Sequence, residues 1–172
     1  MKTITSCDDE SLKEYTRNSL FLGGPTARPL EWWDKNEPSW RAKACTILGK
    51  LDFDGIVCIP EPFANKYMKQ VEWERACLTN CAVIAFWVPR DIKGDMLGLT
   101  TNVELGYWLA KDPMKVVYGR PDGADHTRHL DWLWSKEQYN WRPHHNDLEA
   151  TLKEAMDLIK SFARTLPVGT GR

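Results

Sequence analysis

The residues whose types and spacing best suit chemistry lie in the stretch Leu97–Tyr107, which contains Glu104. The pattern predicts that this glutamate lies in the first turn of a helix that follows a buried strand, where open α/β sheets bind ligands. Unpaired N–H groups and partial positive charge at a helix N-terminus favour an ionised carboxylate. An ionised Glu104 could act as a nucleophile and form a covalent intermediate with a substrate.

The same residues also fit a purely structural role. Thr101 and Glu104 have the spacing of a capping box, in which a threonine and a glutamate satisfy each other's backbone donors at the start of a helix. On local pattern alone this is the simpler interpretation. The two roles are compatible, because Thr101 could cap the helix while the same geometry holds Glu104 at a pocket.

Glu74 is the second carboxylate of interest. On a helix it shares a face with Val71 and Leu78, which predicts that it points toward the sheet. An acid that points inward needs a partner. That partner is either a substrate or an arginine such as Arg41 or Arg75.

A glycine-rich turn, Gly23-Gly24-Pro25-Thr26, follows the first apolar run of the chain. Two residues without a Cβ would let the backbone approach a ligand closely. The turn matches neither the dinucleotide fingerprint nor the P-loop. Its place after a buried strand leaves a plain turn and a substrate floor both open.

The elements that must position these residues are visible as apolar runs and helical spacings. Strands are predicted at Ser19–Leu22, Ile56–Ile59, Val83–Val88 and Met114–Tyr118, and helices from about Ser39, over Lys66–Thr79, around Glu104 and over Asn146–Arg164. We expect the continuously apolar run Val83–Val88 at the centre of the sheet. Loops 23–28, 60–64 and 89–102 would then follow strands, at the edge where such sheets bind ligands.

This alternation predicts an α/β fold, a flavodoxin- or Rossmann-like three-layer sandwich with a mostly parallel central sheet of four or five strands. A length of 172 residues with 42% apolar content suits a single domain over 1–172. We expect residues 1–16 to form a loose polar lead-in before the core begins, and residues 166–172 to form a flexible tail.

Composition argues against several classes of partner. The formal net charge is −1 and no basic tract is present, so neither nucleic acid nor an anionic membrane surface is expected as a partner. The longest apolar run, Cys81–Val88, is too short to span a bilayer. The N-terminus lacks the apolar core of a signal peptide, so a cytoplasmic location is expected.

Other reactive residue types receive structural interpretations. The five cysteines suit reduced, buried thiols, and the spacing of Cys77 and Cys81 gives no metal site without further ligands nearby. The four histidines, including His144 and His145, are assigned to the surface or to helix caps, with a metal site as the alternative. Arg120 could meet a phosphate but is expected to lie on the surface. No metal or cofactor is predicted.

In their order and spacing, Phe21–Pro25, Glu74 and Thr101–Tyr107 resemble the nucleoside 2-deoxyribosyltransferase family, over roughly residues 17–118. The strongest part is the stretch Thr79–Tyr107. The resemblance implies that Glu104, before Leu-Gly, is the nucleophile and that Glu74 holds the sugar or the transferred base. It also implies a homo-oligomer in which one subunit completes the pocket of another.

The chain departs from the family pattern at helper positions. Phe21 stands where family transferases commonly carry a tyrosine, and Gly98 stands where an aspartate usually handles the leaving base, with Asp95 and Asp91 as the nearest acids. Related nucleotide N-glycosidases hold a 5′-phosphate with serines that are absent here. Threonines could replace them: Thr26, Thr100 and Thr101.

The resemblance therefore implies an enzyme that acts on the N-glycosidic bond of a nucleoside or nucleotide by a retaining, two-step mechanism, with a free base as second substrate. A nucleoside or nucleotide N-glycosidase, in which water attacks instead, and a catalytically weak nucleotide-binding domain are the alternatives. The predicted catalytic residue is Glu104. The predicted substrate-binding residues are Gly23, Gly24, Pro25, Thr26, Glu74, Asp95, Thr101 and Asn102.

Overall fold

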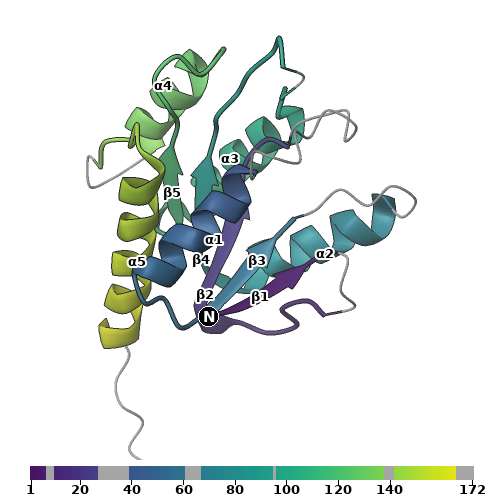
Figure 1. Ribbon diagram of the computed structural model, residues 1–172, viewed down its shortest axis with the longest axis vertical. Coiled ribbons are helices and arrows are strands. Elements are labelled where there is room, and N and C mark those ends of the chain that lie inside the picture. Colours follow the sequence, from purple (N-terminus) through teal and green to yellow (C-terminus); the bar gives the residue numbers. More distant parts are fainter. Residues whose placement is uncertain (7–9, 27–38, 61–66, 95, 138–141, 166–172) are drawn as a thin grey trace, which may run out of the picture.

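Five parallel strands form one sheet in the order β1-β3-β2-β4-β5 (Figure 1). The computed structural model describes residues 1–172 except 7–9, 27–38, 61–66, 95, 138–141 and 166–172. The strands are β1 (Lys2–Thr5), β2 (Thr16–Gly23), β3 (Ile56–Ile59), β4 (Cys81–Trp87) and β5 (Val116–Gly119). The helices are α1 (Trp40–Lys50), α2 (Tyr67–Asn80), α3 (Leu99–Lys111), α4 (Arg128–Glu137) and α5 (Leu148–Thr165).

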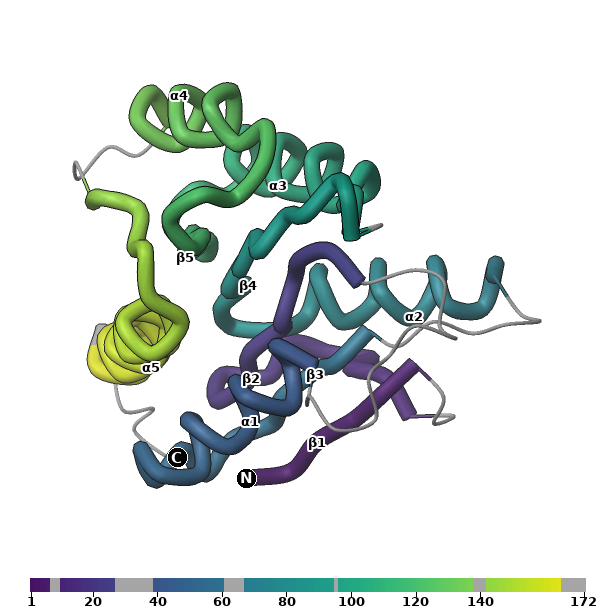
Figure 2. Tube along the Cα trace, turned by 45° about the horizontal axis from the view of Figure 1, so that its top comes forward, coloured from purple at the N-terminus to yellow at the C-terminus, as the bar shows by residue number. Residues whose placement is uncertain are grey.

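Helices cover both faces of the sheet and make three layers (Figure 2). Helices α1 and α5 pack on one face, where Leu48 and Leu152 join the buried cluster of Leu20 and Val83. Helices α2, α3 and α4 pack on the other face around residues such as Phe86. The predicted flavodoxin- or Rossmann-like sandwich with a mostly parallel sheet of four or five strands is therefore confirmed.

The predicted central position of the run Val83–Val88 is wrong. Its strand, β4, lies between β2 and β5, and β2 is the middle strand of the five. Every residue of β4 is buried, because helices cover both faces and a strand covers each edge. A continuous apolar run reports burial, which several strands of a covered sheet share, and does not report order within the sheet.

The described residues of the segment 1–16 are not a loose lead-in before the core. Lys2–Thr5 form the edge strand β1, which pairs in parallel with β3 and buries Ile4. Leu12 is also buried, and Trp73 donates through Nε1 to the carbonyl of Glu10 at 2.7 Å. The prediction failed because a short edge strand with exposed polar residues carries little apolar signal.

The remaining elements follow the prediction with two exceptions. The last strand begins at Val116 rather than Met114, which lies in the 3-10 turn η2 (Pro113–Lys115) and is exposed. Helix α4 was not predicted. It buries Trp134 and leaves Trp132 exposed. The predicted tail, 166–172, lies outside the described residues.

Helix α1 begins at Trp40, next to the predicted start at about Ser39, and Ser39 is its N-cap, whose side chain accepts a hydrogen bond from the Ala42 N–H. Within the described part of the chain, every helix is too short or too polar to cross a membrane.

Candidate functional site

The loop after β2 and the helix after β4 meet at the carboxyl edge of the sheet. After β2 the chain crosses over to β3 on one side, and it later returns to place β4 on the other side (Figure 1). Such a reversal of strand order is where doubly wound sheets bind ligands. Gly24 follows β2 at this point, and Glu104 is carried there by α3, the helix that follows β4.

Gly24 is required by its surroundings as well as by its backbone. Its φ of 148° lies in a region that other residues rarely adopt. A Cβ at this position would lie 2.0 Å from the carbonyl oxygen of Trp87, at the end of β4. The loop after β2 therefore passes directly over the carboxyl end of the neighbouring strand β4. This close approach is compatible with the predicted floor beneath a substrate.

The start of α3 corrects two predictions about Glu104. The helix begins at Leu99, and its N-cap is Gly98, so Thr101 lies inside the first turn and is not the cap. Glu104 is the sixth residue of the helix and lies in the second turn. The predicted capping box is therefore absent. The helix started earlier than predicted because Gly98 adopts the left-handed conformation, with φ 60° and ψ 42°.

Gly98 also explains one departure from the family pattern. A Cβ at this position would lie 2.8 Å from the Cβ of Pro25, in the loop after β2. A side chain here would strain the backbone and push this loop away from α3. The position where an aspartate was expected is thus the contact between the two segments of the candidate site.

Glu104 lies close to a second carboxyl group and to an arginine. The side chain is half-buried, and its pKa is raised to about 8 by burial first and then by the negative charge of Glu74. The guanidinium of Arg41 opposes this rise. The expectation that a helix N-terminus keeps Glu104 ionised is wrong, because the side chain lies one turn further along and is buried beside another acid.

Glu74 is half-buried and reaches the same region from α2. Burial raises its pKa, while a hydrogen bond from Gln70 and the charge of Arg41 oppose the rise. Gln70 Nε2 donates to Glu74 Oε1 at 2.8 Å. Of the two apolar residues predicted to share a face with Glu74, Leu78 is buried and Val71 is exposed. The structure nevertheless brings both predicted carboxyl groups together.

Arg41, one of the two arginines expected as a partner of Glu74, holds the glycine-rich loop. It is 7% exposed, and its Nε donates to the carbonyl of Leu22 at 3.2 Å. Its Nη2 donates to the carbonyl of Gly24 at 2.7 Å, and its Nη1 donates to Thr26 Oγ1 at 2.9 Å. The residue therefore touches the loop while its charge acts on both carboxyl groups.

A comparison with models of protein families matches residues 17–122 to the family described as nucleoside 2-deoxyribosyltransferase like. The chain belongs to this family. None of the curated proteins compared with the chain matches it. In this family member the matched region contains β2 to β5, the glycine-rich loop, Glu74 and Glu104.

The other predicted site residues of this family member have different surroundings. Thr101 is buried, at 3% exposure. Asn102 is exposed, and its Oδ1 accepts a hydrogen bond from Arg90. Asp91 caps its own loop by accepting from the Gly94 N–H at 2.9 Å. Asp95, residues 27–28 and residues 61–64 of the expected ligand-binding loops lie outside the described part of the chain.

Phe21, which stands at the expected tyrosine position, is 1% exposed and contacts the ring of Trp73, with centroids 6.4 Å apart. It belongs to the core between the sheet and α2. The aromatic group at this position therefore gives this family member packing and no hydroxyl.

Sequence reasoning missed Arg90 and assigned Arg41 no role in the loop. Arg90 lies in the loop that follows β4 and is buried; it donates to the carbonyl of His126 at 3.0 Å and to Asn102. It thereby ties α3 to the loop after β5. The sequence contained one indication that Arg41 has a specific partner. The residue lies at the start of a predicted helix, where a cation is opposed by the positive end of the helix dipole.

Arg120 is not a free surface residue. Its Nε and Nη2 donate to Asp131 at 2.9 and 3.0 Å, and the hydroxyl of Tyr118 donates to the same carboxylate at 2.9 Å. This network joins β5 to α4. Among the described residues, no group of three or more histidine, cysteine or acidic side chains is arranged to hold a metal ion.

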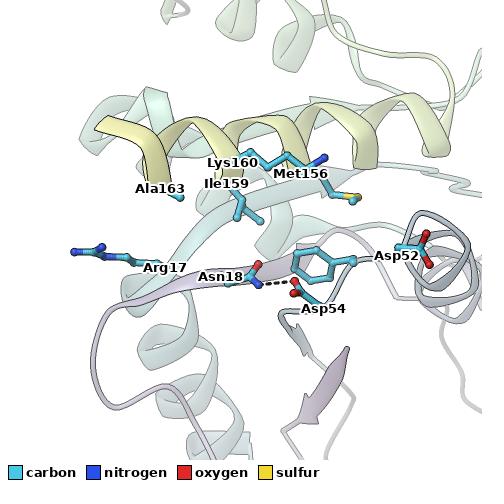
Figure 3. Close-up of a pocket in the computed structure, with 9 residues that line it drawn as sticks. Arg17, Asn18, Asp52, Asp54, Met156, Ile159, Lys160 and Ala163 are labelled. Carbon is cyan, nitrogen blue, oxygen red and sulfur yellow. Dashed lines mark hydrogen bonds between the residues drawn. The ribbon is translucent and has the colours of Figure 1, made fainter. Parts of the chain in front are cut away.

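A cavity of about 250 Å³ lies at the opposite, amino-terminal edge of the sheet (Figure 3). Phe53, Met156 and Ile159 are among the apolar residues that line it, and Arg17 and Lys160 are among the charged ones. The charged residues that line it are exposed, and it does not include the carboxyl groups of the candidate site. The cavity therefore plays no part in the chemistry discussed below.

Proposed function

We propose that this protein is a nucleoside 2-deoxyribosyltransferase-like enzyme that cleaves the N-glycosidic bond of a nucleoside or nucleotide, with Glu104 as nucleophile. The observation that carries the proposal is the meeting of Glu104, Glu74 and Arg41 beside the loop after β2. Three helices supply these groups at the reversal of strand order. Family membership supports the same chemistry.

In the proposed reaction an oxygen of ionised Glu104 attacks C1′ of the sugar on the face opposite the base. The C1′–N bond breaks, its electron pair leaves with the base, and a covalent glycosyl ester forms. The nitrogen of a second base then attacks C1′ and releases the carboxylate. Two inversions restore the original configuration, so the overall reaction proceeds with retention.

We assign Glu74 to bind hydroxyl groups of the sugar or an edge of the base, because its negative charge raises the pKa of Glu104 and an ionised carboxylate accepts hydrogen bonds. The leaving base takes up a proton from water, and the incoming base gives up its N–H proton to water in the second step. Glu104 must itself be ionised before it attacks, although its pKa is about 8 in the free protein. We therefore expect kcat/KM to rise with pH through the neutral range.

The remaining predicted residues support these groups in the proposal. Gly23, Gly24, Pro25 and Thr26 form the floor under the substrate. Thr101 packs inside the first turn of α3, and Asn102 is oriented by Arg90. No cofactor or metal takes part in the proposed reaction.

The decisive experiment is base exchange between a deoxynucleoside and a free base, followed by chromatography. We expect Glu104→Gln to abolish exchange, while Glu72→Gln, which changes an exposed acid on α2, leaves it intact. Circular dichroism of each variant checks that it is folded. Undiminished exchange by folded Glu104→Gln would refute the nucleophile.

Omission of the acceptor base separates a transferase from an N-glycosidase. An N-glycosidase releases free sugar at full rate without an acceptor, because water attacks the glycosyl ester. A transferase needs the second base to turn over. Both outcomes require Glu104, so this comparison decides the acceptor and not the nucleophile.

Phe21 and Gly98 favour a second candidate, a nucleotide-binding domain with weak or no catalysis. Neither residue can donate a proton where family transferases commonly carry helper groups. Calorimetric binding of a nucleoside without any turnover over long incubation would support this candidate. Any bond cleavage that depends on Glu104 would exclude it.

We further propose that the protein forms a homo-oligomer through the outer face of α3. Three large apolar side chains, Leu99, Val103 and Tyr107, are exposed there and recur at every fourth residue, so they share one face of the helix. An exposed apolar stripe of this kind is typical of a contact surface. Because α3 also carries Glu104, a second copy bound there would lie beside the candidate site.

A further inference from the structure

The outer edge of β5 is covered by a segment from later in the chain. β5 lies at one edge of the sheet, and residues 142–147, which precede α5, run alongside it (Figure 2). The edge of a sheet carries backbone N–H and C=O groups that can pair with a strand of another chain. The partners of these groups in β5 therefore decide whether the edge is open.

The backbone of His145 pairs with this edge like a strand of one residue. Its N–H donates to the carbonyl of Tyr118 at 3.2 Å, and its carbonyl accepts from the N–H of Arg120 at 2.9 Å. The carbonyl of Gly119, between them, faces inward and accepts from the N–H of Val88 at 2.9 Å. The pairing is parallel, as it is between β4 and β5. His145 thus lies where a sixth strand would pair.

Arg142 extends this cover along β5 with its side chain. Its Nη2 donates to the carbonyl of Val116 at 3.0 Å, so a guanidinium N–H replaces the backbone N–H of a further strand. Its own carbonyl accepts from Nε1 of Trp134 in α4 at 2.8 Å, and Trp134 is fully buried. The segment is therefore anchored to α4 while it binds the outer carbonyls of β5.

A single carboxylate of α5 binds both covering residues. Glu154 Oε1 accepts from Arg142 Nη1 at 2.8 Å, and Glu154 Oε2 lies 2.5 Å from Nε2 of His145. These three side chains are at most 26% exposed, so water screens their contacts less than it screens the exposed pair of Glu149 and Lys153 on the same helix. Glu154 thus holds the segment against β5.

We propose that residues 142–145 form a strap that blocks the outer edge of β5 from pairing with a strand of a second copy of this chain. A second copy has such a strand, because β1 pairs with β3 alone in the described part of the chain. Natural sheets commonly cover their edges to prevent association of this kind. The strap takes no part in the chemistry assigned to Glu104, so its role is independent of the proposed function.

The first measurement is hydrogen exchange, followed by NMR, with Glu154→Ala as the variant. The N–H groups of Arg120 and His145 bond across the strap, whereas that of Val88 bonds to the inner side of β5. We expect exchange of the first two to rise by about tenfold or more relative to Val88, because the variant removes two charge-assisted contacts. The control Glu149→Ala removes an exposed ion pair and should change this ratio by less than about twofold. An unchanged ratio in folded Glu154→Ala would overturn the proposal.

The second measurement is sedimentation over a range of protein concentrations. In a Val103→Glu background, which adds a charge to the outer face of α3 and so separates the two surfaces, Glu154→Ala should associate and Glu149→Ala should not. Gly24→Ala in the same background controls for lost stability, because it strains the loop after β2 and leaves the strap intact. Faster exchange without association, or equal association of Gly24→Ala and Glu154→Ala, would overturn the proposal.

His145→Ala is the second variant and answers the same question if Glu154→Ala does not fold. It removes one contact of Glu154 and leaves the pair with Arg142 in place. The backbone groups at position 145 remain, so the same N–H groups can be followed. We expect their exchange to rise by about threefold relative to Val88. No rise in folded His145→Ala would overturn the proposal.

Discussion

Replacement of Glu104 by glutamine should stabilise the protein at alkaline pH and leave its stability in acid nearly unchanged. Burial and Glu74 raise the pKa of Glu104 from 4.5 to about 8 in the folded protein. The unfolded chain therefore releases this proton near pH 4.5, and the folded protein releases it only near pH 8. Between these values the unfolded state binds fewer protons, so folding stability falls as pH rises.

The structure sets the size of this effect. A pKa shift from 4.5 to about 8 corresponds to a stability loss of about 5 kcal/mol above pH 8 if Glu104 titrates alone. Glu74 and Arg41 can readjust around the new charge, and a buried glutamine amide has its own desolvation cost. We therefore expect Glu104→Gln to gain about 2 kcal/mol over the unaltered protein between pH 4.5 and pH 8.

Urea unfolding followed by tryptophan fluorescence at several pH values measures this difference directly. Subtraction of the unaltered protein at each pH cancels the titration of all other groups. Glu72→Gln, on the exposed face of α2, serves as the control and should show a difference independent of pH. The reasoning would be refuted if the gain from Glu104→Gln were equal at pH 5 and pH 8.5, or if this variant were the less stable protein at pH 8.5.

Other perturbations test the loop, the network at α4 and the outer face of α3. Gly24→Ala should lower the free energy of unfolding by about 2–4 kcal/mol, because Gly24 has a positive φ and an added Cβ would meet a β4 carbonyl. The control Gly49→Ala, in a helix with open space around it, should raise the free energy of unfolding by about 0.5–1 kcal/mol. Urea unfolding compares the two variants, and equal effects would contradict the account of the loop. Asp131→Asn should lower the free energy of unfolding by about 1–3 kcal/mol, because it weakens the partly buried, bidentate ion pair with Arg120. The control Asp157→Asn changes an exposed residue and should alter the free energy of unfolding by less than about 0.5 kcal/mol. Thermal unfolding of both variants measures the difference. Val103→Glu places a charge on the exposed stripe of α3 and should shift sedimentation toward the monomer without loss of helicity; an assembly that survives the change would count against contact through this face.

Much of the fold was predictable because burial on two faces leaves a simple trace in sequence. The second half of β2, at Leu20–Leu22, and the whole of β3 and β4 are apolar without interruption, since helices cover both sides of the sheet. The start of α1 near Ser39 was predictable because apolar residues recur at helical spacing after it, including the buried Ala44 and Leu48. β1 and α4 escaped prediction, since β1 is short and at the edge of the sheet and α4 buries only part of its aromatic surface.

The sequence by itself determined the residue types of the candidate site, namely two carboxyl groups and a glycine turn placed after predicted strands. It could not determine where α3 begins, because that depends on the left-handed Gly98 and its contact with Pro25. The tertiary structure alone decided that Glu104 is buried near Glu74 and that the charge of Arg41, on a helix of the other layer, acts on both carboxyl groups. The physical reason is that desolvation and charge pairing depend on separations in space between residues that are far apart in the chain.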